Sequence, residues 1–293
     1  MSRAADARSV VNLYRFDRVA SILPEPAALT EDALLRYQTE GFVAIENLLT
    51  PDEVEEAKAA LSDLIHGRVA EYKTPLQPEA EFQDTWEAMS AAERADRVRK
   101  IWRFVESEPR LNTLAVSHPA LQTVLEKLIG EPVHLIQDMA LLKPPHIGTE
   151  KPWHQDGAYF GWRPPEKIIG VWIALDEATA ENGCMHVIPG THRAGPVPHT
   201  HDRDCQIPDD RVKVAEDVLV PLKPGGALFF SSLLHHGTPP NNSPHRRWAL
   251  QYHYAATSCE PINRVQHAEM FFEDGRYQGC RGMIGQPLED LEP

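Results

Sequence analysis

Cysteine is scarce in this sequence, and a long apolar run is missing. The four cysteines, Cys184, Cys205, Cys259 and Cys280, include no C-x-x-C pair, so they indicate neither a zinc site nor a redox dithiol. The opening residues, MSRAADARSV, lack the apolar segment of a secretory signal, and no stretch approaches the roughly 18 consecutive apolar residues that span a bilayer. We therefore expect a soluble protein of the cytoplasm, a reducing compartment, with no membrane partner.

Basic residues are also few. The chain has 29 Lys and Arg against 43 Asp and Glu, which gives a net charge of −14 at pH 7. Proteins that bind nucleic acid neutralise phosphates with Lys and Arg, so this balance argues against a nucleic-acid partner. The charge of the whole chain does not determine the charge of a pocket, and a polyanionic substrate would need only a local basic patch.

The length of 293 residues suits one enlarged β-rich domain better than two smaller ones. Residues 1–28 show no sustained hydrophobic period, and we expect an arm laid over the surface. The domain itself is expected over residues 29–258. The remainder, residues 259–293, is predicted to be a tail that packs on the domain or on a partner subunit. The oligomeric state is left open.

Two helices are indicated before a β-rich half. Thr50-Pro51-Asp52-Glu53 is a capping box with proline at the first helical position, and Gly67 ends that helix. Pro119 begins the second helix, which Gly130 ends. From Val133 onward, short apolar runs separated by Pro, Gly and Asn predict many short strands. The expected fold is mainly β with flanking helices: a double-stranded β-helix of the jelly-roll or cupin kind, with the N-terminal helices packed on one sheet.

A histidine and an aspartate stand two residues apart in Trp153-His154-Gln155-Asp156-Gly157. On an extended segment both side chains face the same side, where a ring nitrogen and a carboxylate oxygen reach one metal. Among 14 histidines and 43 acidic residues such a pair arises by chance, so it needs a third ligand. His235 and His236, at the end of the strand that follows Pro224-Gly225-Gly226, are both candidates. Two histidines and one carboxylate leave three adjacent metal positions free, as iron(II) oxygenases require.

An arginine completes the pattern. A 2-oxo acid that chelates the metal needs a cation for its far carboxylate, and a guanidinium matches a carboxylate bidentately. Arg246 and Arg247 both follow the histidine pair. Arg246 shares its strand face with large apolar side chains, whereas Arg247 alternates with Ala249, Gln251 and His253 on a small, polar face. The polar face suits a cavity, which favours Arg247.

These residues resemble the phytanoyl-CoA dioxygenase family of 2-oxoglutarate oxygenases. Its motifs run H-x-D, then N-G-x-x-x-x-x-P-G-[ST]-H, then H-G-[ST] with an arginine eleven residues after that histidine. They are matched by His154 to Asp156, by Asn182 to His192, and by His236-Gly237-Thr238 with Arg247. The stretch from Tyr37 to Leu49, with the capped helix after it, also looks like the opening of the family. The resemblance covers roughly residues 30–256, and its motifs are highly specific together.

The resemblance implies an iron(II)-dependent dioxygenase that uses 2-oxoglutarate and O₂ and releases succinate and CO₂ while it hydroxylates or desaturates a small organic molecule. His154, Asp156 and His236 would be the metal ligands and so the catalytic centre. Two residues, Arg247 and Thr238, would hold the distal carboxylate of 2-oxoglutarate. The other residues implied at the co-substrate site are Trp172, Lys100, Met139 and Gln155.

Several alternatives remain. His235 rivals His236, and the eleven-residue offset to Arg247 favours His236. His199 and His201 repeat the period-two spacing but fit a solvated loop, and residues 193–217 are long enough to form an active-site lid. The competing functions are a catalytically silent metal or small-molecule binding protein on the same barrel, and a zinc or manganese hydrolase or isomerase.

Overall fold

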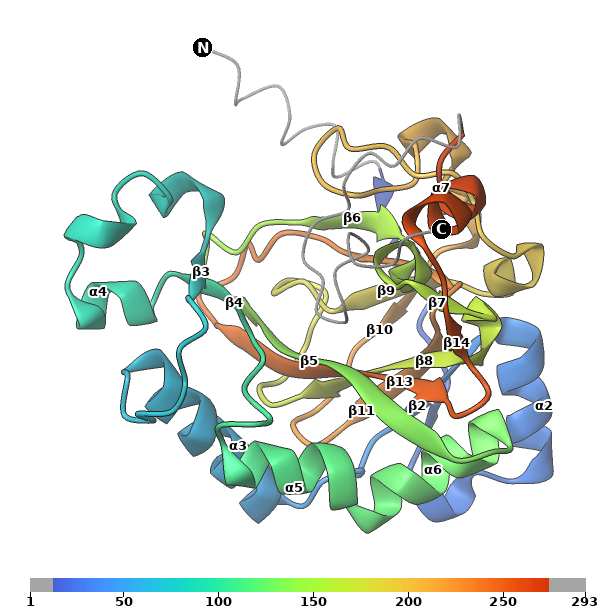
Figure 1. The fold of residues 1–293 in the computed structure, drawn as a ribbon, viewed down its shortest axis with the longest axis horizontal. Helices are drawn as coiled ribbons and strands as arrows, with labels where there is room; N and C mark the ends of the chain where they lie inside the picture. Colours follow the sequence, from blue (N-terminus) through green and yellow to red (C-terminus); the bar gives the residue numbers. More distant parts are fainter. Residues whose placement is uncertain (1–12, 274–293) are drawn as a thin grey trace.

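The computed structural model describes residues 13–273, which form two facing β-sheets with helices on one side (Figure 1). The larger sheet has eight strands in the order β1-β2-β11-β8-β13-β5-β4-β3, the smaller sheet has four in the order β10-β9-β12-β6, and β14 pairs with β7. The strands are β1 (Ile22–Leu23), β2 (Phe42–Ile45), β3 (Gln77–Pro78), β4 (Val98–Trp102), β5 (Val133–Lys143), β6 (Lys151–His154), β7 (Trp162–Arg163), β8 (Ile168–Ala174), β9 (Met185–Ile188), β10 (Val218–Val220), β11 (Ala227–Ser231), β12 (His235–Thr238), β13 (Arg247–Ala256) and β14 (Glu260–Pro261).

Helices cover the outer face of the larger sheet, where Figure 1 shows α3, α5 and α6 side by side. The helices are α2 (Glu31–Glu40), α3 (Pro51–Ile65), α4 (Ala91–Ala95), α5 (Pro109–Ser117), α6 (Pro119–Ile129) and α7 (Arg264–Phe271). Leu61 of α3, Leu121 of α6 and Leu250 of β13 belong to one buried cluster between these layers. A second cluster, which includes Trp172 and Val187, fills the space between the two sheets. Every residue of β8 is buried because the sheet is covered on both faces.

The predicted jelly roll is confirmed, although the two sheets face each other without a ladder that closes them into a barrel in the described part of the chain. The helix beginnings are also correct. Thr50 and Glu53 form the capping box of α3. Pro119 is the first residue of α6, and Gly130 caps its end with φ of 79°, a conformation that favours glycine.

The segment before α2 lies against the smaller sheet. The indole Nε1 of Trp153 donates to Leu13 O at 2.8 Å, and the Tyr14 and Trp153 rings stack with centroids 5.3 Å apart. Val19 bridges to Leu219, and β1 then joins β2 at the edge of the larger sheet. Of the predicted tail, only the part up to residue 273 is described. The division into arm, domain and tail stays a prediction.

Two observations bear on the expected location. No helix between residues 13 and 273 is both long enough and apolar enough to cross a bilayer. Cys184 and Cys259 are free, but Cys205 is disulfide-bonded. The cytoplasmic location expected from the sequence stays a prediction.

Candidate active site

Two paired strands bring the three expected metal ligands together. In the antiparallel pair of β6 and β12, His154 lies directly opposite His236. Asp156 follows His154 at the start of a 3₁₀ turn. Its Oδ1 is 3.2 Å from His154 Nε2 and 3.5 Å from His236 Nε2. All three ligand atoms lie within 4.8 Å of one another, so a single ion placed between them contacts all three.

Backbone carbonyls orient both imidazole rings. The Nδ1 of His154 lies 2.7 Å from Pro152 O, and the Nδ1 of His236 lies 3.0 Å from Leu234 O. An Nδ1 that faces a carbonyl carries the proton, which leaves the Nε2 lone pair for a metal. Burial, with the charge of His236, lowers the pKa of His154 to about 4. His154 is therefore neutral near pH 7, as a metal ligand must be.

Strand β13 holds the carboxylate of Asp156. Gln251 Nε2 donates to Asp156 Oδ2 at 3.1 Å, and His253 Nε2 lies 2.7 Å from the same oxygen. Both partners are almost completely buried. Burial alone would raise the pKa of Asp156, but His236 and His253 hold it well below its usual range. One oxygen is thus occupied by protein donors, the other faces the two imidazoles, and the donor set of two nitrogens and one carboxylate oxygen fits iron(II).

A cavity of about 620 Å³ opens beside these ligands. Arg247 lines it, is only 2% exposed, and lies with Cζ 5.1 Å from the centre of the Trp172 ring. Its guanidinium makes long bonds to two carbonyls, Gly183 O at 3.3 Å and Leu141 O at 3.5 Å. Burial lowers its pKa to about 10, so it stays charged near pH 7. No carboxylate pairs with it within residues 13–273, and the cavity therefore contains a buried cation that lacks an anion.

The neighbouring arginine points elsewhere. Arg246 Nε is 3.0 Å from Asp176 Oδ2, and its guanidinium stacks on Trp248 at 4.0 Å, on the outside of the sheet. Arg247 rather than Arg246 thus belongs to the cavity, as the strand alternation indicates.

The remaining predicted residues divide into two groups. Thr238, Lys100 and Met139 line the cavity. Trp172 is fully buried behind Arg247 and supports that guanidinium from the core. Gln155 does not reach the cavity: its amide donates to Gly195 O at 2.9 Å and Leu233 O at 2.7 Å and accepts from Val197 N at 2.9 Å. The expectation that Gln155 points toward the co-substrate therefore does not match its position.

Two other histidines are buried outside the ligand cluster, and of these only His199 differs from expectation. His199 is 1% exposed, and its Nε2 accepts a hydrogen bond from Gln155 N at 3.0 Å, so it is not part of a solvated loop. His235 is buried on the opposite side of β12 from His236, and neither of its ring nitrogens has a hydrogen-bond partner among the described residues. It does not belong to the ligand cluster.

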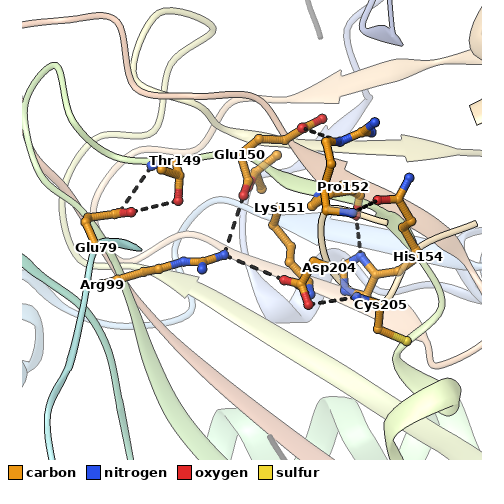
Figure 2. Close-up of polar contacts among 12 residues, drawn as sticks. Glu79, Arg99, Thr149, Glu150, Lys151, Pro152, His154, Asp204 and Cys205 are labelled. Carbon is orange, nitrogen blue, oxygen red and sulfur yellow. Dashed lines mark hydrogen bonds and ion pairs between the residues drawn. The ribbon is translucent and has the colours of Figure 1, made fainter. Parts of the chain in front are cut away.

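Sequence reasoning missed a polar network at the mouth of the cavity (Figure 2). Asp204, from the segment between β9 and β10, lies 2.6 Å from Lys151 Nζ of β6 and 3.7 Å from Arg99 Nη2 of β4. Nearby, Thr149 Oγ1 donates to Glu79 at 2.7 Å. The network ties the loop of residues 193–217 to both sheets. It could not be found by motif because its members come from separate strands and a loop.

The fold and this site together define a non-haem iron, 2-oxoglutarate-dependent oxygenase. The family model for phytanoyl-CoA dioxygenase (PhyH) matches residues 37–249, and the chain therefore belongs to the phytanoyl-CoA dioxygenase family.

Known relatives agree with this assignment. The chain is 27% identical over 244 residues to mouse peroxisomal phytanoyl-CoA dioxygenase, with 78% of this chain and 68% of the relative covered. It is 26% identical over 280 residues to zebrafish (Danio rerio) phytanoyl-CoA dioxygenase domain-containing protein 1, covering 82% and 96%.

Solved structures share the fold. EvdO2 from Micromonospora carbonacea var. aurantiaca, complexed with 2-oxoglutarate, is 25% identical with a TM-score of 0.63, covering 80% of this chain and 93% of that one. EctD from S. alaskensis in its apo form is 22% identical with a TM-score of 0.65, covering 82% and 81%, and this likeness concerns the fold alone.

Proposed function

We propose that the protein hydroxylates or desaturates a small organic substrate and converts 2-oxoglutarate to succinate and CO₂. His154, Asp156 and His236 hold the iron. Arg247 binds the distal carboxylate of 2-oxoglutarate, with the Thr238 hydroxyl beside it, and Lys100 and Met139 complete the co-substrate site. Iron with 2-oxoglutarate supplies the O₂-activating chemistry when bound. The protein supplies position, a cavity with restricted water access, and the choice of the C–H bond presented.

The observation that supports this proposal best is the unpaired guanidinium of Arg247. Burying a charge without a partner costs several kcal/mol of folding free energy. Such a charge is retained where a bound ligand supplies the opposite charge. A bidentate carboxylate is the ligand that a planar guanidinium matches best. The three metal ligands and Arg247 line the same cavity, which supports one dicarboxylate as the ligand of both the metal and the arginine.

The test measures succinate formation from 2-oxoglutarate with iron(II) and O₂, with and without a library of candidate substrates. We expect uncoupled turnover in the wild type and none after Asp156→Ala, which removes the charged ligand. The absence of succinate under every condition, with metal still bound, would instead support a catalytically silent binding protein. Activity that persists without O₂ and 2-oxoglutarate would support a hydrolase or isomerase.

A second measurement separates the two arginines. Arg247→Ala should weaken 2-oxoglutarate by a hundredfold or more, because loss of a buried charged pair costs roughly 3–5 kcal/mol, while cobalt(II) affinity stays within about threefold. Arg246→Ala is the matched control and should change 2-oxoglutarate affinity by less than about twofold, since exposed ion pairs contribute little. A larger loss in Arg246→Ala than in Arg247→Ala would refute the assignment.

A further inference from the structure

The cavity is basic although the chain is acidic. Its lining contains six cationic side chains and only two carboxylates, whereas the whole chain has a net charge of −14. The cations are Arg99, Lys100, Lys143, Lys151, Arg203 and Arg247, and the carboxylates are Asp156 and Asp204. Asp156 faces the proposed metal, so Asp204 is the carboxylate left to balance the cations.

Four of the six cations are already accounted for. Arg247 and Lys100 are assigned to the 2-oxoglutarate site. Lys143 Nζ donates to the carbonyls of Thr149 and Pro239, both at 2.6 Å. Arg203 binds Asp209 bidentately at 2.7 and 2.8 Å, outside the cavity lining.

The other two cations, Arg99 and Lys151, share Asp204. Lys151 holds it closely at 2.6 Å, and Arg99 reaches it only at 3.7 Å. The ammonium of Lys100 lies 5.7 Å from the centre of the Trp102 ring. Apart from Lys100, two positive charges face one negative charge at the cavity mouth, where Figure 2 shows Arg99, Lys151 and Asp204 converging from different segments.

Burial and neighbouring positive charges both affect the pKa values of these groups. Burial, together with the charges of Lys151 and Arg99, lowers the pKa of Lys100 to about 8. Burial alone would raise the pKa of Asp204, but the charge of Lys151 and its hydrogen bond keep it below the usual range. An anion at this place would offset the mutual repulsion of the cations. The rest of the wall is apolar, with Leu76, Trp102, Met139 and Phe160 among the lining residues.

We propose that the substrate of this cavity has an apolar body and one oxyanion group, a carboxylate or a phosphate, which Arg99 binds beside the Lys151–Asp204 ion pair. This inference rests on the proposed function. Apolar contacts orient the body of the substrate, and the fixed anion determines which carbon faces the metal ligands. The competing occupant is the co-substrate itself, and the experiment distinguishes the two.

The experiment uses the full chain, anaerobic and loaded with cobalt(II) and saturating 2-oxoglutarate, so that the Arg247 position is filled. Three probes with a common aromatic body are titrated by calorimetry: phenylacetate, phenyl phosphate and benzyl alcohol. The variants are Arg99→Gln and Arg97→Gln. Arg97 is a matched control because it precedes the same strand but does not line the cavity.

We expect an anion to bind the wild type at least about tenfold more tightly than benzyl alcohol. Arg99→Gln should remove about tenfold of that preference, since a charge-assisted hydrogen bond contributes on that scale. Arg97→Gln should match the wild type. Selective binding of phenylacetate identifies a carboxylate substrate, and selective binding of phenyl phosphate identifies a phosphate ester.

The inference is overturned if benzyl alcohol binds as tightly as the anions, if neither anion binds, or if Arg99→Gln weakens 2-oxoglutarate as much as the probes. The last result would assign these cations to the co-substrate. The two proposals fail separately: absence of 2-oxoglutarate binding to the wild type refutes the proposed function, whereas Arg99-dependent binding of the anions survives that result.

Discussion

At the scale of single residues, the contacts of Asp156 Oδ2 are as important for the metal site as those of Oδ1, which faces the two imidazoles. His253 and Gln251 both contact Oδ2, at 2.7 and 3.1 Å, and so restrict the carboxylate to one orientation. His253 is itself held against the Phe160 ring, with centroids 4.7 Å apart. We infer that the pair are positioning residues that keep Oδ1 directed at the metal, in the way that partners of metal ligands commonly do.

Replacing His253 tests this role. His253→Phe keeps the ring volume but leaves Oδ2 with Gln251 alone, and we expect cobalt(II) affinity of the apoprotein to fall about ten- to a hundredfold. His253→Gln, which restores a donor, should recover part of the loss. Metal titration followed by the d–d absorption of cobalt gives the affinity and the ligand geometry together. Unchanged affinity and spectrum in His253→Phe would show that the contact is only structural.

At the scale of elements, the side chain of Gln155 anchors the loop between β9 and β10. Gln155 bonds three backbone groups around the loop, those of Gly195, Val197 and Leu233. Asp204, which belongs to the loop, also forms an ion pair with Lys151 of β6. The loop predicted to form a lid contributes His201, Arg203 and Asp204 to the lining of the cavity.

Removing the Gln155 side chain should make the loop between β9 and β10 more mobile. Gln155→Ala removes three hydrogen bonds at roughly 1 kcal/mol each, and we expect faster proteolysis between residues 195 and 207 and a higher KM for substrate. The affinity for 2-oxoglutarate should change little, because Gln155 does not line the cavity. Gln38→Ala, at an exposed position of α2, is the control. Equal loss of 2-oxoglutarate and substrate affinity would contradict a role confined to the loop.

Elements differ in how well the sequence predicts them. The beginnings of α3 and α6 were correct because caps and Pro–Gly boundaries act within a few residues. Helices α2, α5 and α7 were not predicted. The sequence pattern predicts the third ligand at the end of the strand that follows Pro224-Gly225-Gly226, whereas His236 lies in β12, a separate strand after a turn. Strands of four residues such as β6 and β12 carry too short a pattern to recognise alone.

At the scale of the whole molecule, several histidines are buried in neutral form. Burial lowers the pKa of His199 to about 3 and the pKa of His235 to about 4, against an ordinary value of 6.5. The unfolded chain takes up these protons near pH 6.5, but the folded chain does not until a much lower pH. The free energy of unfolding therefore falls as pH decreases from about 6.5 to about 4.

We expect each such histidine to contribute about 1.4 kcal/mol per pH unit over that interval. The apoprotein should lose stability steeply below pH 6, as measured by urea unfolding at a series of pH values. His235→Leu removes two unpartnered ring nitrogens, and it should flatten the slope by about one proton without loss of stability at pH 7. His245→Leu, at an exposed position, should leave the slope unchanged. If the free energy of unfolding of His235→Leu depends on pH as steeply as that of the wild type, burial of neutral His235 is not the cause of the pH dependence.

The sequence by itself determined the features that depend on neighbouring residues: the His154 and Asp156 pair, the alternation that separates Arg247 from Arg246, and the helix caps. It also favoured His236 over His235 through the eleven-residue offset to Arg247, and the pairing of β12 with β6 then places His236 opposite His154. Only the tertiary structure turned Gln155 toward the loop, brought His253 to Asp156, and gathered Arg99 and Lys151 around Asp204. The physical reason is that strand pairing joins segments far apart in the chain, and no local pattern encodes which side chains then meet.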